Sequence, residues 1–263
     1  MIKLIASDID GTLVPDSTDQ INPEIYGLII RLQEKGIRFV AASGRQYKSI
    51  RRLFAPVADD ILYIAESGGI LRDAKELYFA DGIGKERIRE LINDIRKIDN
   101  TDIMLCGVDN GYCDSADSYL YHWMTEAYRY DMIAVNNLEE DITEPVVKVS
   151  MFHPECAELA ASKEFTPKWQ KVMQVSCSGV NWMDVMNAST HKGHALKCLQ
   201  ERLGIAPEET MVFGDNTNDL TMLEQAYYSY AIGNAREEVK QCARFQADTC
   251  NHDGVLKVLR TLL

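Results

Sequence analysis

The sequence predicts an α/β fold, in which a parallel sheet carries helices on both of its faces. Three observations lead to this prediction. Short apolar segments alternate with longer segments of helical periodicity near both ends of the chain. The connections between these segments are short, as in right-handed β-α-β units. Each apolar segment also ends in a cluster of polar residues, as strands do where their carboxyl ends form a ligand-binding edge.

The first 81 residues are expected to contain three parallel strands and the helices between them. Pro23 opens a helical pattern whose apolar positions share one face, and Gly36 ends it. The expected elements are, in order, a strand at residues 2–7, the helix after Pro23, a strand at 37–42, a short helix through Ile50, a strand at 61–65 and a hairpin around Arg72.

The pattern changes from about residue 82, where a charged amphipathic helix is expected from Gly84 to Ile98. Strand pairs mixed with helices follow it and indicate an α+β unit with an antiparallel sheet. We therefore expect an inserted domain at residues 82–186 between two parts of one core domain, residues 1–81 and 187–263. The expected strands of the insertion cover residues 103–106, 112–114, 132–135, 146–152, 172–176 and 182–186, and a Tyr-rich helix covers 118–128.

After residue 187 the alternation of strands and helices returns. Lys192 begins a helix that ends at Gly204, and a buried strand is expected at residues 210–213. That strand runs into the polar stretch Gly214-Asp215-Asn216-Thr217-Asn218-Asp219. A helix through Leu220, a strand at 228–232 and helices after Ala235 and Asp253 complete the chain.

The composition argues against several classes of function. The 263 residues carry a formal net charge of −12, whereas phosphate backbones and anionic membranes are bound through an excess of Lys and Arg. We therefore expect neither a nucleic-acid partner nor a membrane partner. No apolar segment is long enough to span a bilayer, no leader is expected, and the seven cysteines include no C-x-x-C pair. These observations favour a cytoplasmic protein without a disulfide framework or a thiolate metal site.

Two acids that directly follow the first strand are the first candidates for chemistry. Asp8 and Asp10 are separated by one residue, so in an extended segment their carboxylates point to the same side. At 4 Å, two such charges repel by roughly 4 kcal/mol at an effective dielectric constant of ~20. The pair therefore calls for a cation, a shared proton or solvent. A polar cap between strand and turn explains the same two residues.

Polar residues at the other strand ends are expected at the same edge of the sheet. Asp8, Asp10 and Asp215 would supply oxygen ligands for a hard cation that keeps several waters, which suits Mg²⁺. Ser43 and the amide of Gly44 would bind a phosphate at a helix N-terminus. Ser43 as an ordinary helix cap is the alternative.

Lys192 is the most telling single residue of the sequence. A lysine in the first turn of a helix opposes the helix dipole, which costs roughly 0.3–1 kcal/mol, and a bound anion would explain it. An exposed lysine that points away into solvent is the alternative. We interpret the flanking His191 and His194 as surface or structural residues. Arg45 is a second candidate anion contact, with a surface ion pair as its alternative.

Four short motifs, in this order, resemble those of the haloacid dehalogenase-like hydrolase superfamily. They are Asp8-Ile9-Asp10-Gly11-Thr12, Ser43-Gly44-Arg45, Lys192-Gly193 and Gly214-Asp215-Asn216-Thr217-Asn218-Asp219. The long insertion between the second and third motifs resembles the type IIB cap of the Cof-type branch. The resemblance covers essentially the whole chain and implies a Rossmann-like core domain and a cap domain that determines substrate specificity.

The resemblance also implies roles for individual residues. Asp8 would be the nucleophile and a Mg²⁺ ligand, and Asp10 the general acid/base and a ligand through its backbone carbonyl. Asp215 would be the third ligand, and Lys192 would be catalytic and bind the phosphoryl group. The remaining implied roles are phosphate binding by Ser43, Gly44 and Asn218, and support of the site by Thr12 and Asp219.

The expected function is Mg²⁺-dependent hydrolysis of a small phosphorylated metabolite through an aspartyl-phosphate intermediate. A sugar phosphate, a nucleotide and a cofactor phosphate all remain open as the substrate. A phosphosugar mutase and a non-enzymatic regulator that binds a phosphorylated metabolite are the alternative functions, because one scaffold hosts many chemistries.

The insertion is expected to close over the site as a lid and to select the substrate. Its Tyr119, Tyr121, His122 and Trp182 would line a sugar-sized pocket or form the core of the insertion itself. In the core domain, Ser67-Gly68 stands where relatives commonly carry Asn-Gly. An amide that could contact the substrate or the cap is therefore lost.

Overall fold

The computed structural model describes residues 1–15, 18 and 20–263 and divides the chain into two compact units. Unit 1 comprises Met1–Arg45, Ile50–Phe79 and His191–Leu263, and unit 2 comprises Gln46–Ser49 and Ala80–Thr190. The second unit is thus an insertion in the chain of the first. The domain boundaries expected from the sequence, at 82 and 187, stay predictions.

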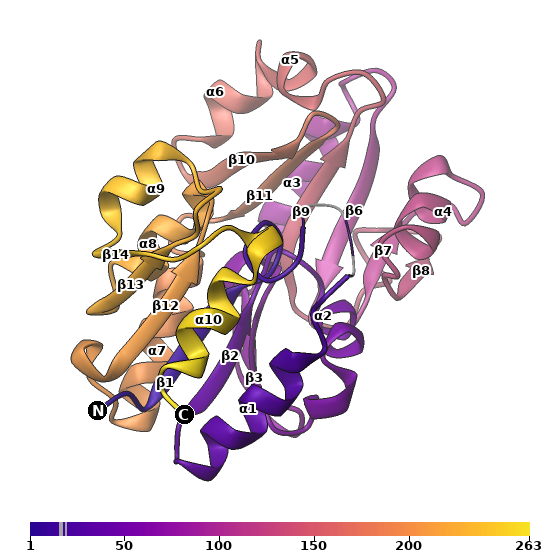
Figure 1. Ribbon diagram of the computed structural model, residues 1–263. Coiled ribbons are helices and arrows are strands. Elements are labelled where there is room, and N and C mark those ends of the chain that lie inside the picture. The colour runs from indigo at the N-terminus through magenta and orange to yellow at the C-terminus, as the bar shows by residue number, and fades with distance from the viewer. Residues whose placement is uncertain (16–17, 19) are drawn as a thin grey trace. The chain divides into compact units, whose positions relative to one another are not determined.

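An eight-stranded sheet forms the centre of unit 1 and has the strand order β14-β13-β12-β1-β2-β3-β4-β5 (Figure 1). The pairs from β14 to β3 are parallel, and β4 runs antiparallel to β3. The strands of this sheet are β1 (Leu4–Asp8), β2 (Arg38–Ala42), β3 (Leu62–Ala65), β4 (Ile70–Arg72), β5 (Leu77–Ala80), β12 (Thr210–Gly214), β13 (Tyr228–Ala231) and β14 (Phe245–Gln246). The predicted α/β class is therefore confirmed.

Helices cover both faces of this sheet, because alternate residues of its buried strands point to opposite sides. Leu4 and Ala6 of β1 belong to a hydrophobic cluster with Leu196 and Leu199 of α7. Ile5 points to the other face, on which α1 and α10 lie in front of the strands (Figure 1). The helices are α1 (Glu24–Glu34), α2 (Tyr47–Leu53), α7 (Lys192–Leu203), α8 (Leu220–Leu223), α9 (Glu237–Cys242) and α10 (Gly254–Arg260).

Unit 2 has its own six-stranded sheet, with the order β10-β11-β9-β6-β7-β8. All of its pairs are antiparallel except β7 with β8. Its strands are β6 (Asp102–Gly107), β7 (Gly111–Cys113), β8 (Met132–Ala134), β9 (Val146–Phe152), β10 (Met173–Gly179) and β11 (Trp182–Asn187). Its helices are α3 (Lys85–Ile95), α4 (Tyr119–Glu126), α5 (Ala157–Ala161) and α6 (Phe165–Trp169).

The core of unit 2 accounts for part of the aromatic set singled out in the sequence. Trp182 is buried in a hydrophobic cluster with Phe152, 5.2 Å between ring centroids, and Tyr121 packs against that cluster. Tyr119 is exposed. A second cluster on this unit centres on Trp169, which is 1% exposed.

Most α-helices and strands of the described residues follow the sequence prediction within a few residues, and three of them were not predicted. The predicted apolar face of α1 is confirmed, because Ile25, Leu28, Ile29 and Leu32 are all buried. The short helices α5 and α6 and the two-residue strand β14 lie in segments without clear periodicity. Each is too short for a period to stand out from its neighbours.

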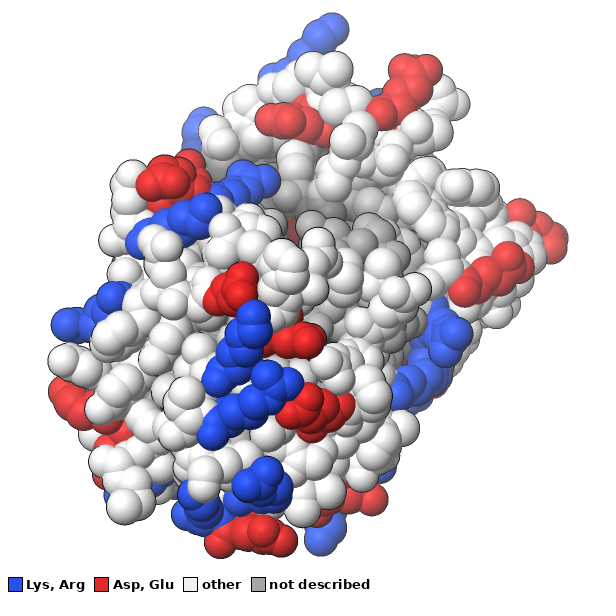
Figure 2. All heavy atoms as spheres, viewed as in Figure 1, with Lys and Arg blue, Asp and Glu red and all other residues white. Residues whose placement is uncertain are grey.

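Two further features bear on the classes of partner. Within the described residues, no helix is both long enough and apolar enough to cross a membrane. On the face drawn in Figure 2, Lys and Arg side chains lie among Asp and Glu side chains rather than in one continuous basic patch.

Candidate active site

The register of the central strands brings three of the predicted motifs to one edge of the sheet. Asp8, the last residue of β1, pairs with Ala42 of β2, which directly precedes Ser43. On the other side of β1, Ser7 pairs with Phe213 of β12, which leads into Asp215. The carboxyl ends of parallel strands share an edge, and the sequence motifs meet there for that reason.

Lys192 is buried between two carboxylates at this edge. Its ammonium Nζ donates to Oδ1 of Asp8 at 2.5 Å and to Oδ1 of Asp219 at 2.7 Å, and the residue is 1% exposed. The alternative of a solvent-exposed lysine is therefore wrong. The two carboxylates provide the negative charge that a lysine in the first turn of a helix requires.

His191 explains how the helix that carries Lys192 begins. It is the N-cap of α7, and its ring Nδ1 accepts a hydrogen bond from the backbone N–H of His194 at 3.0 Å. This contact satisfies one of the N–H groups that have no partner within the helix. The structural interpretation of His191 agrees with this geometry.

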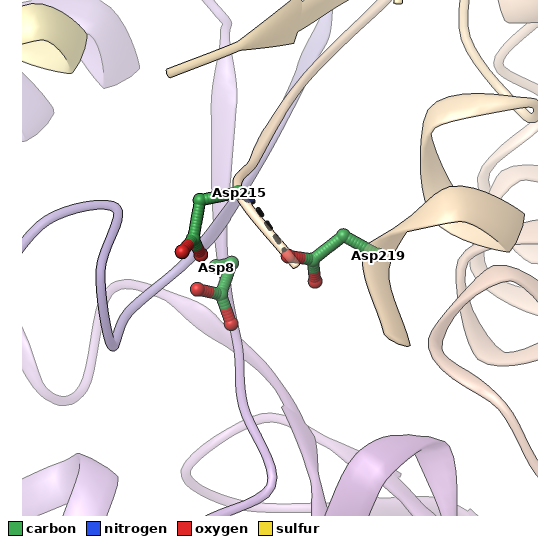
Figure 3. Close-up of side chains that lie close together, drawn as sticks. All are labelled: Asp8, Asp215 and Asp219. Atoms are coloured by element: carbon green, nitrogen blue, oxygen red, sulfur yellow. Dashed lines mark hydrogen bonds between the residues drawn. The ribbon is translucent and has the colours of Figure 1, made fainter. Parts of the chain in front are cut away.

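Three carboxylates, Asp8, Asp215 and Asp219, lie close together (Figure 3), and two of them, Asp8 and Asp219, bind Lys192. One oxygen from each lies within 4.8 Å of the others. Asp219 is fully buried, and its Oδ2 accepts the backbone N–H groups of Asp215 at 3.1 Å and Asn216 at 3.2 Å. Thr12 donates its hydroxyl to Oδ1 of Asp215 at 3.0 Å.

The excess of negative charge governs protonation at the site. Burial, together with the nearby carboxylates of Asp219 and Asp215, raises the pKa of Asp8 well above its ordinary value, although Lys192 opposes the shift. Burial alone would lower the pKa of Lys192, but Asp219 and Asp8 together raise it above its ordinary value. The lysine is therefore charged, and its single ammonium pairs with two members of a three-carboxylate cluster.

This donor set fits a hard divalent cation. Carboxylate oxygens are the ligands that Mg²⁺ prefers, and a divalent charge would offset the carboxylates that Lys192 leaves uncompensated. Within the cluster, Asp8 and Asp215 fit the ligand role better than Asp219. Both oxygens of Asp219 already accept hydrogen bonds, from Lys192 and from two backbone N–H groups.

Asp10 lies in a different environment from Asp8. Its carboxylate accepts hydrogen bonds from Arg45, from Nη2 at 2.6 Å and from Nε at 3.0 and 3.2 Å, and from the Ser43 hydroxyl at 3.4 Å. Among the described residues, the Asp10 side chain is not part of the carboxylate cluster. The strand ends at Asp8, so the alternation of an extended segment does not continue to Asp10. Asp10 as a ligand through its backbone carbonyl stays a prediction.

The loop of Ser43 and Gly44, predicted to bind phosphate, differs from its expected setting. Ser43 is buried, and its hydroxyl oxygen accepts the N–H of Arg45 at 3.1 Å. The prediction that Ser43 and Gly44 lie at a helix N-terminus is wrong, because α2 begins at Tyr47. Arg45 forms an ion pair with Asp10, as its alternative interpretation states, but the Arg45 side chain is only 14% exposed, so the pair does not lie at the surface.

Two further residues complete the edge. Asn218 is exposed in the short 3₁₀ helix Thr217–Asp219, on the rim formed by the loop after β12. Asn234 was not among the predicted site residues, yet its side-chain amide donates to the carbonyl of Gly11 at 2.8 Å. The sequence feature that could have indicated Asn234 is the turn-forming pair Gly233-Asn234, which directly follows the strand expected at residues 228–232. Asn234 thus holds the turn that follows Asp8 and Asp10.

Comparisons with known proteins agree with this geometry. A family model described as haloacid dehalogenase-like hydrolase matches residues 5–259. The 5-amino-6-(5-phospho-D-ribitylamino)uracil phosphatase YbjI of Escherichia coli is 29% identical over 273 residues, which cover 100% of this chain and 96% of YbjI. A crystal structure of a protein from Eubacterium rectale is 35% identical, with a TM-score of 0.93, over 100% of this chain and 99% of that one. A subclass IIB sugar phosphatase, 22% identical with a TM-score of 0.80 over 99% and 98% of the two chains, shares the fold.

Proposed function

The chain belongs to the haloacid dehalogenase-like hydrolase family, in its Cof-type, subclass IIB branch, and from this premise we propose that it hydrolyses the phosphate ester of a small metabolite with Mg²⁺ bound beside Asp8. It is a phosphoric monoester hydrolase of that family. The observation that carries the proposal is the buried ammonium of Lys192 between Asp8 and Asp219, with Asp215 beside them. A phosphate dianion next to Asp8 would contact this ammonium, and bound Mg²⁺ would offset the negative charge that Lys192 leaves uncompensated.

In the proposed first step, a carboxylate oxygen of Asp8 attacks phosphorus, and the bond from phosphorus to the ester oxygen breaks. Asp10 gives its proton to that leaving oxygen, so the alcohol departs neutral. The product is an acyl phosphate on Asp8. Because Arg45 binds the ionised form of Asp10, this proton transfer requires the ion pair to weaken in the substrate complex.

In the second step, Asp10 takes a proton from water, and the resulting nucleophile attacks phosphorus and restores the Asp8 carboxylate. Inorganic phosphate leaves. Lys192 neutralises charge on the phosphoryl oxygens in both steps, and Ser43, Gly44 and Asn218 orient the group. Mg²⁺, held by Asp8, Asp215 and the Asp10 carbonyl, would supply electrostatic stabilisation of the phosphoryl oxygens.

The substrate class proposed is a small phosphorylated metabolite, selected by the inserted domain at 82–186. Two relatives support this class, since one is named for a ribitylaminouracil phosphate and one for a sugar phosphate. A sugar phosphate, a nucleotide and a cofactor phosphate therefore belong in one test panel. The ribitylaminouracil phosphate is the first compound to include.

The experiment measures release of inorganic phosphate from that panel, with MgCl₂ and with EDTA. Asp8→Asn should abolish phosphate release without unfolding the protein. Asp60→Asn, at an exposed position, should release phosphate at the wild-type rate. Substantial turnover by Asp8→Asn would remove Asp8 as the nucleophile. Turnover in EDTA at the full rate would contradict the metal requirement.

The same assay separates this proposal from its two alternatives. A phosphosugar mutase would convert a sugar phosphate into an isomer without releasing phosphate. A regulator would bind a phosphorylated metabolite tightly and turn over none of the panel, with or without Mg²⁺. Retention of Asp8, Asp10, Lys192 and Asp215 favours turnover over either alternative.

A further inference from the structure

The turn that follows β3 has three consecutive residues in the left-handed region of backbone conformation. Its φ angles are 47° at Glu66, 57° at Ser67 and 104° at Gly68. Glycine adopts this region freely, whereas residues with a Cβ meet steric strain there. Glu66 and Ser67 therefore hold a conformation that their surroundings impose, which marks the turn as a fixed part of the structure.

One side of this turn is bound to the loop that carries Ser43. The backbone N–H of Ser67 donates to the carbonyl of Ser43 at 3.0 Å, and that of Glu66 donates to the carbonyl of Arg45 at 3.1 Å. A Cβ on Gly44 would lie 3.2 Å from the Ser67 hydroxyl oxygen. The turn and the Ser43 loop are thus in direct contact along both backbones.

The other side of the turn lies against the start of α7. A Cβ on Gly68 would lie 2.4 Å from the carbonyl carbon of His191, 2.5 Å from its oxygen and 2.8 Å from the backbone nitrogen of Lys192. These atoms are backbone and cannot rotate away as a side chain would. Across the helix, a Cβ on Gly193 would lie 2.2 Å from the carbonyl oxygen of Thr221. The first turn of α7 is therefore enclosed from two sides.

We propose that Gly68 is a positioning residue for Lys192, and that the left-handed turn sets the location of its ammonium in the site. A side chain at position 68 would push the peptide between His191 and Lys192 away from the turn. Gly193 leaves α7 little room to move, so the displacement would pass to the lysine side chain. Its contacts to Asp8 and Asp219, at 2.5 and 2.7 Å, are already at hydrogen-bond length. The inference rests on the proposed function, because it concerns the group that is to neutralise the phosphate.

Gly68→Ala tests this, with Gly204→Ala as the matched control. Gly204 is also left-handed, at φ 63°, and follows the other end of α7, but a Cβ there would have no neighbour within 4 Å. Both variants introduce the same kind of backbone strain, and only Gly68→Ala disturbs Lys192. We expect kcat to fall about 10- to 100-fold in Gly68→Ala, with a smaller change in KM. Gly204→Ala should keep kcat within about twofold, and both should be assayed well below their Tm.

A crystal structure of Gly68→Ala gives a readout that does not depend on turnover. We expect the Lys192 ammonium to leave its 2.5 Å contact with Asp8. The positioning role would be overturned if Lys192 did not move in this structure. It would also be overturned if the wild type were active and Gly68→Ala and Gly204→Ala had equal kcat values. Either result would leave the phosphatase proposal standing. Failure of the wild type to hydrolyse any phosphate ester would overturn the proposed function, and the crystal structure would still decide the positioning role.

Ser67→Gly is the second variant, in case Gly68→Ala does not fold. It relieves the strain at φ 57° and gives the turn freedom to leave the left-handed region. A loss of kcat, about threefold or more, without a fall in Tm is expected if the fixed turn positions Lys192. Wild-type kcat in Ser67→Gly would count against the role. The combination of lost activity with retained stability is one that a purely structural role does not produce.

Discussion

Lys192 offsets part of the negative charge of the candidate site. Of the three carboxylates in the cluster, Asp8 and Asp219 accept hydrogen bonds from its ammonium. Removing one partner from a buried ion pair leaves charge in a place where water cannot solvate it. The same lysine is therefore expected to matter for stability as well as for turnover.

Lys192→Met should lower the stability of unit 1 by about 3–5 kcal/mol and abolish phosphate release. Lys197→Met, at an exposed position of the same helix, should change both by little. Urea unfolding followed by circular dichroism measures the first effect, and the phosphate assay measures the second. Full activity of Lys192→Met would show that the lysine is only structural.

Addition of Mg²⁺ should raise the Tm of the wild-type protein. A ligand that binds only the folded chain stabilises it by about 2.7 kcal/mol at 100 times its dissociation constant. Asp215→Asn should reduce this shift, because it replaces a carboxylate of the cluster by a neutral group. Differential scanning fluorimetry at increasing MgCl₂ checks both. An undiminished shift in Asp215→Asn would place the cation elsewhere.

At the scale of elements, α3 and α6 of unit 2 are joined through one carboxylate. Asp94 accepts hydrogen bonds from Lys168 at 2.5 Å and from the Trp169 ring N–H at 3.0 Å, and its other oxygen accepts from Lys97 at 2.8 Å. Burial alone would raise the pKa of Asp94, but the hydrogen bonds from Lys168 and Lys97 lower it below its ordinary value. The two helices thus gain stability from an ionised group.

Asp94→Asn should therefore lower stability by about 1 kcal/mol at pH 7. Because the pKa of Asp94 is lower in the folded chain, its contribution is complete above the ordinary value of 3.8 and is lost as pH falls through the folded value. The stability difference between variant and wild type should thus narrow below about pH 4. Urea titrations from pH 7 to pH 3 measure it, with exposed Asp99→Asn as the control. A difference that is constant with pH would contradict the ionic contribution.

At the scale of the whole molecule, each unit has a hydrophobic core of its own. The cluster around Leu4 and Leu196 lies in unit 1, and the cluster around Trp169 lies in unit 2. Units with separate cores can unfold in separate transitions when one is weakened. The carboxylate cluster of Asp8, Asp215 and Asp219 belongs to unit 1.

Trp169→Ala should split thermal unfolding into two transitions. Loss of a buried tryptophan costs about 3–5 kcal/mol, and the cost falls on unit 2. Mg²⁺ should then raise the midpoint temperature of the later transition, which belongs to unit 1, and leave that of the earlier transition unchanged. Differential scanning calorimetry with and without MgCl₂ tests this. A single transition that shifts as a whole would show that the two units unfold together.

Much of the fold was predictable because its signals are local. The apolar periodicity of α1, the glycine after α7 and the polar ends of β1 and β12 all depend on neighbouring residues. The helices α5 and α6 were missed because five residues are too few for a helical period to show. The setting of Asp10 was missed because its partner, Arg45, comes from the loop after β2.

By itself, the sequence determined the α/β class and the placing of Asp8, Ser43 and Asp215 at strand ends on one edge of the sheet. This follows because the alternation of strands with helices and the polar residues at strand ends are encoded in short segments. Only the tertiary structure decided that Lys192 is buried between Asp8 and Asp219, and that Arg45 binds Asp10. It also decided that Gly68, which has no side chain, lies against the peptide bond between His191 and Lys192. Contacts between residues far apart in the chain depend on packing, to which no local pattern corresponds.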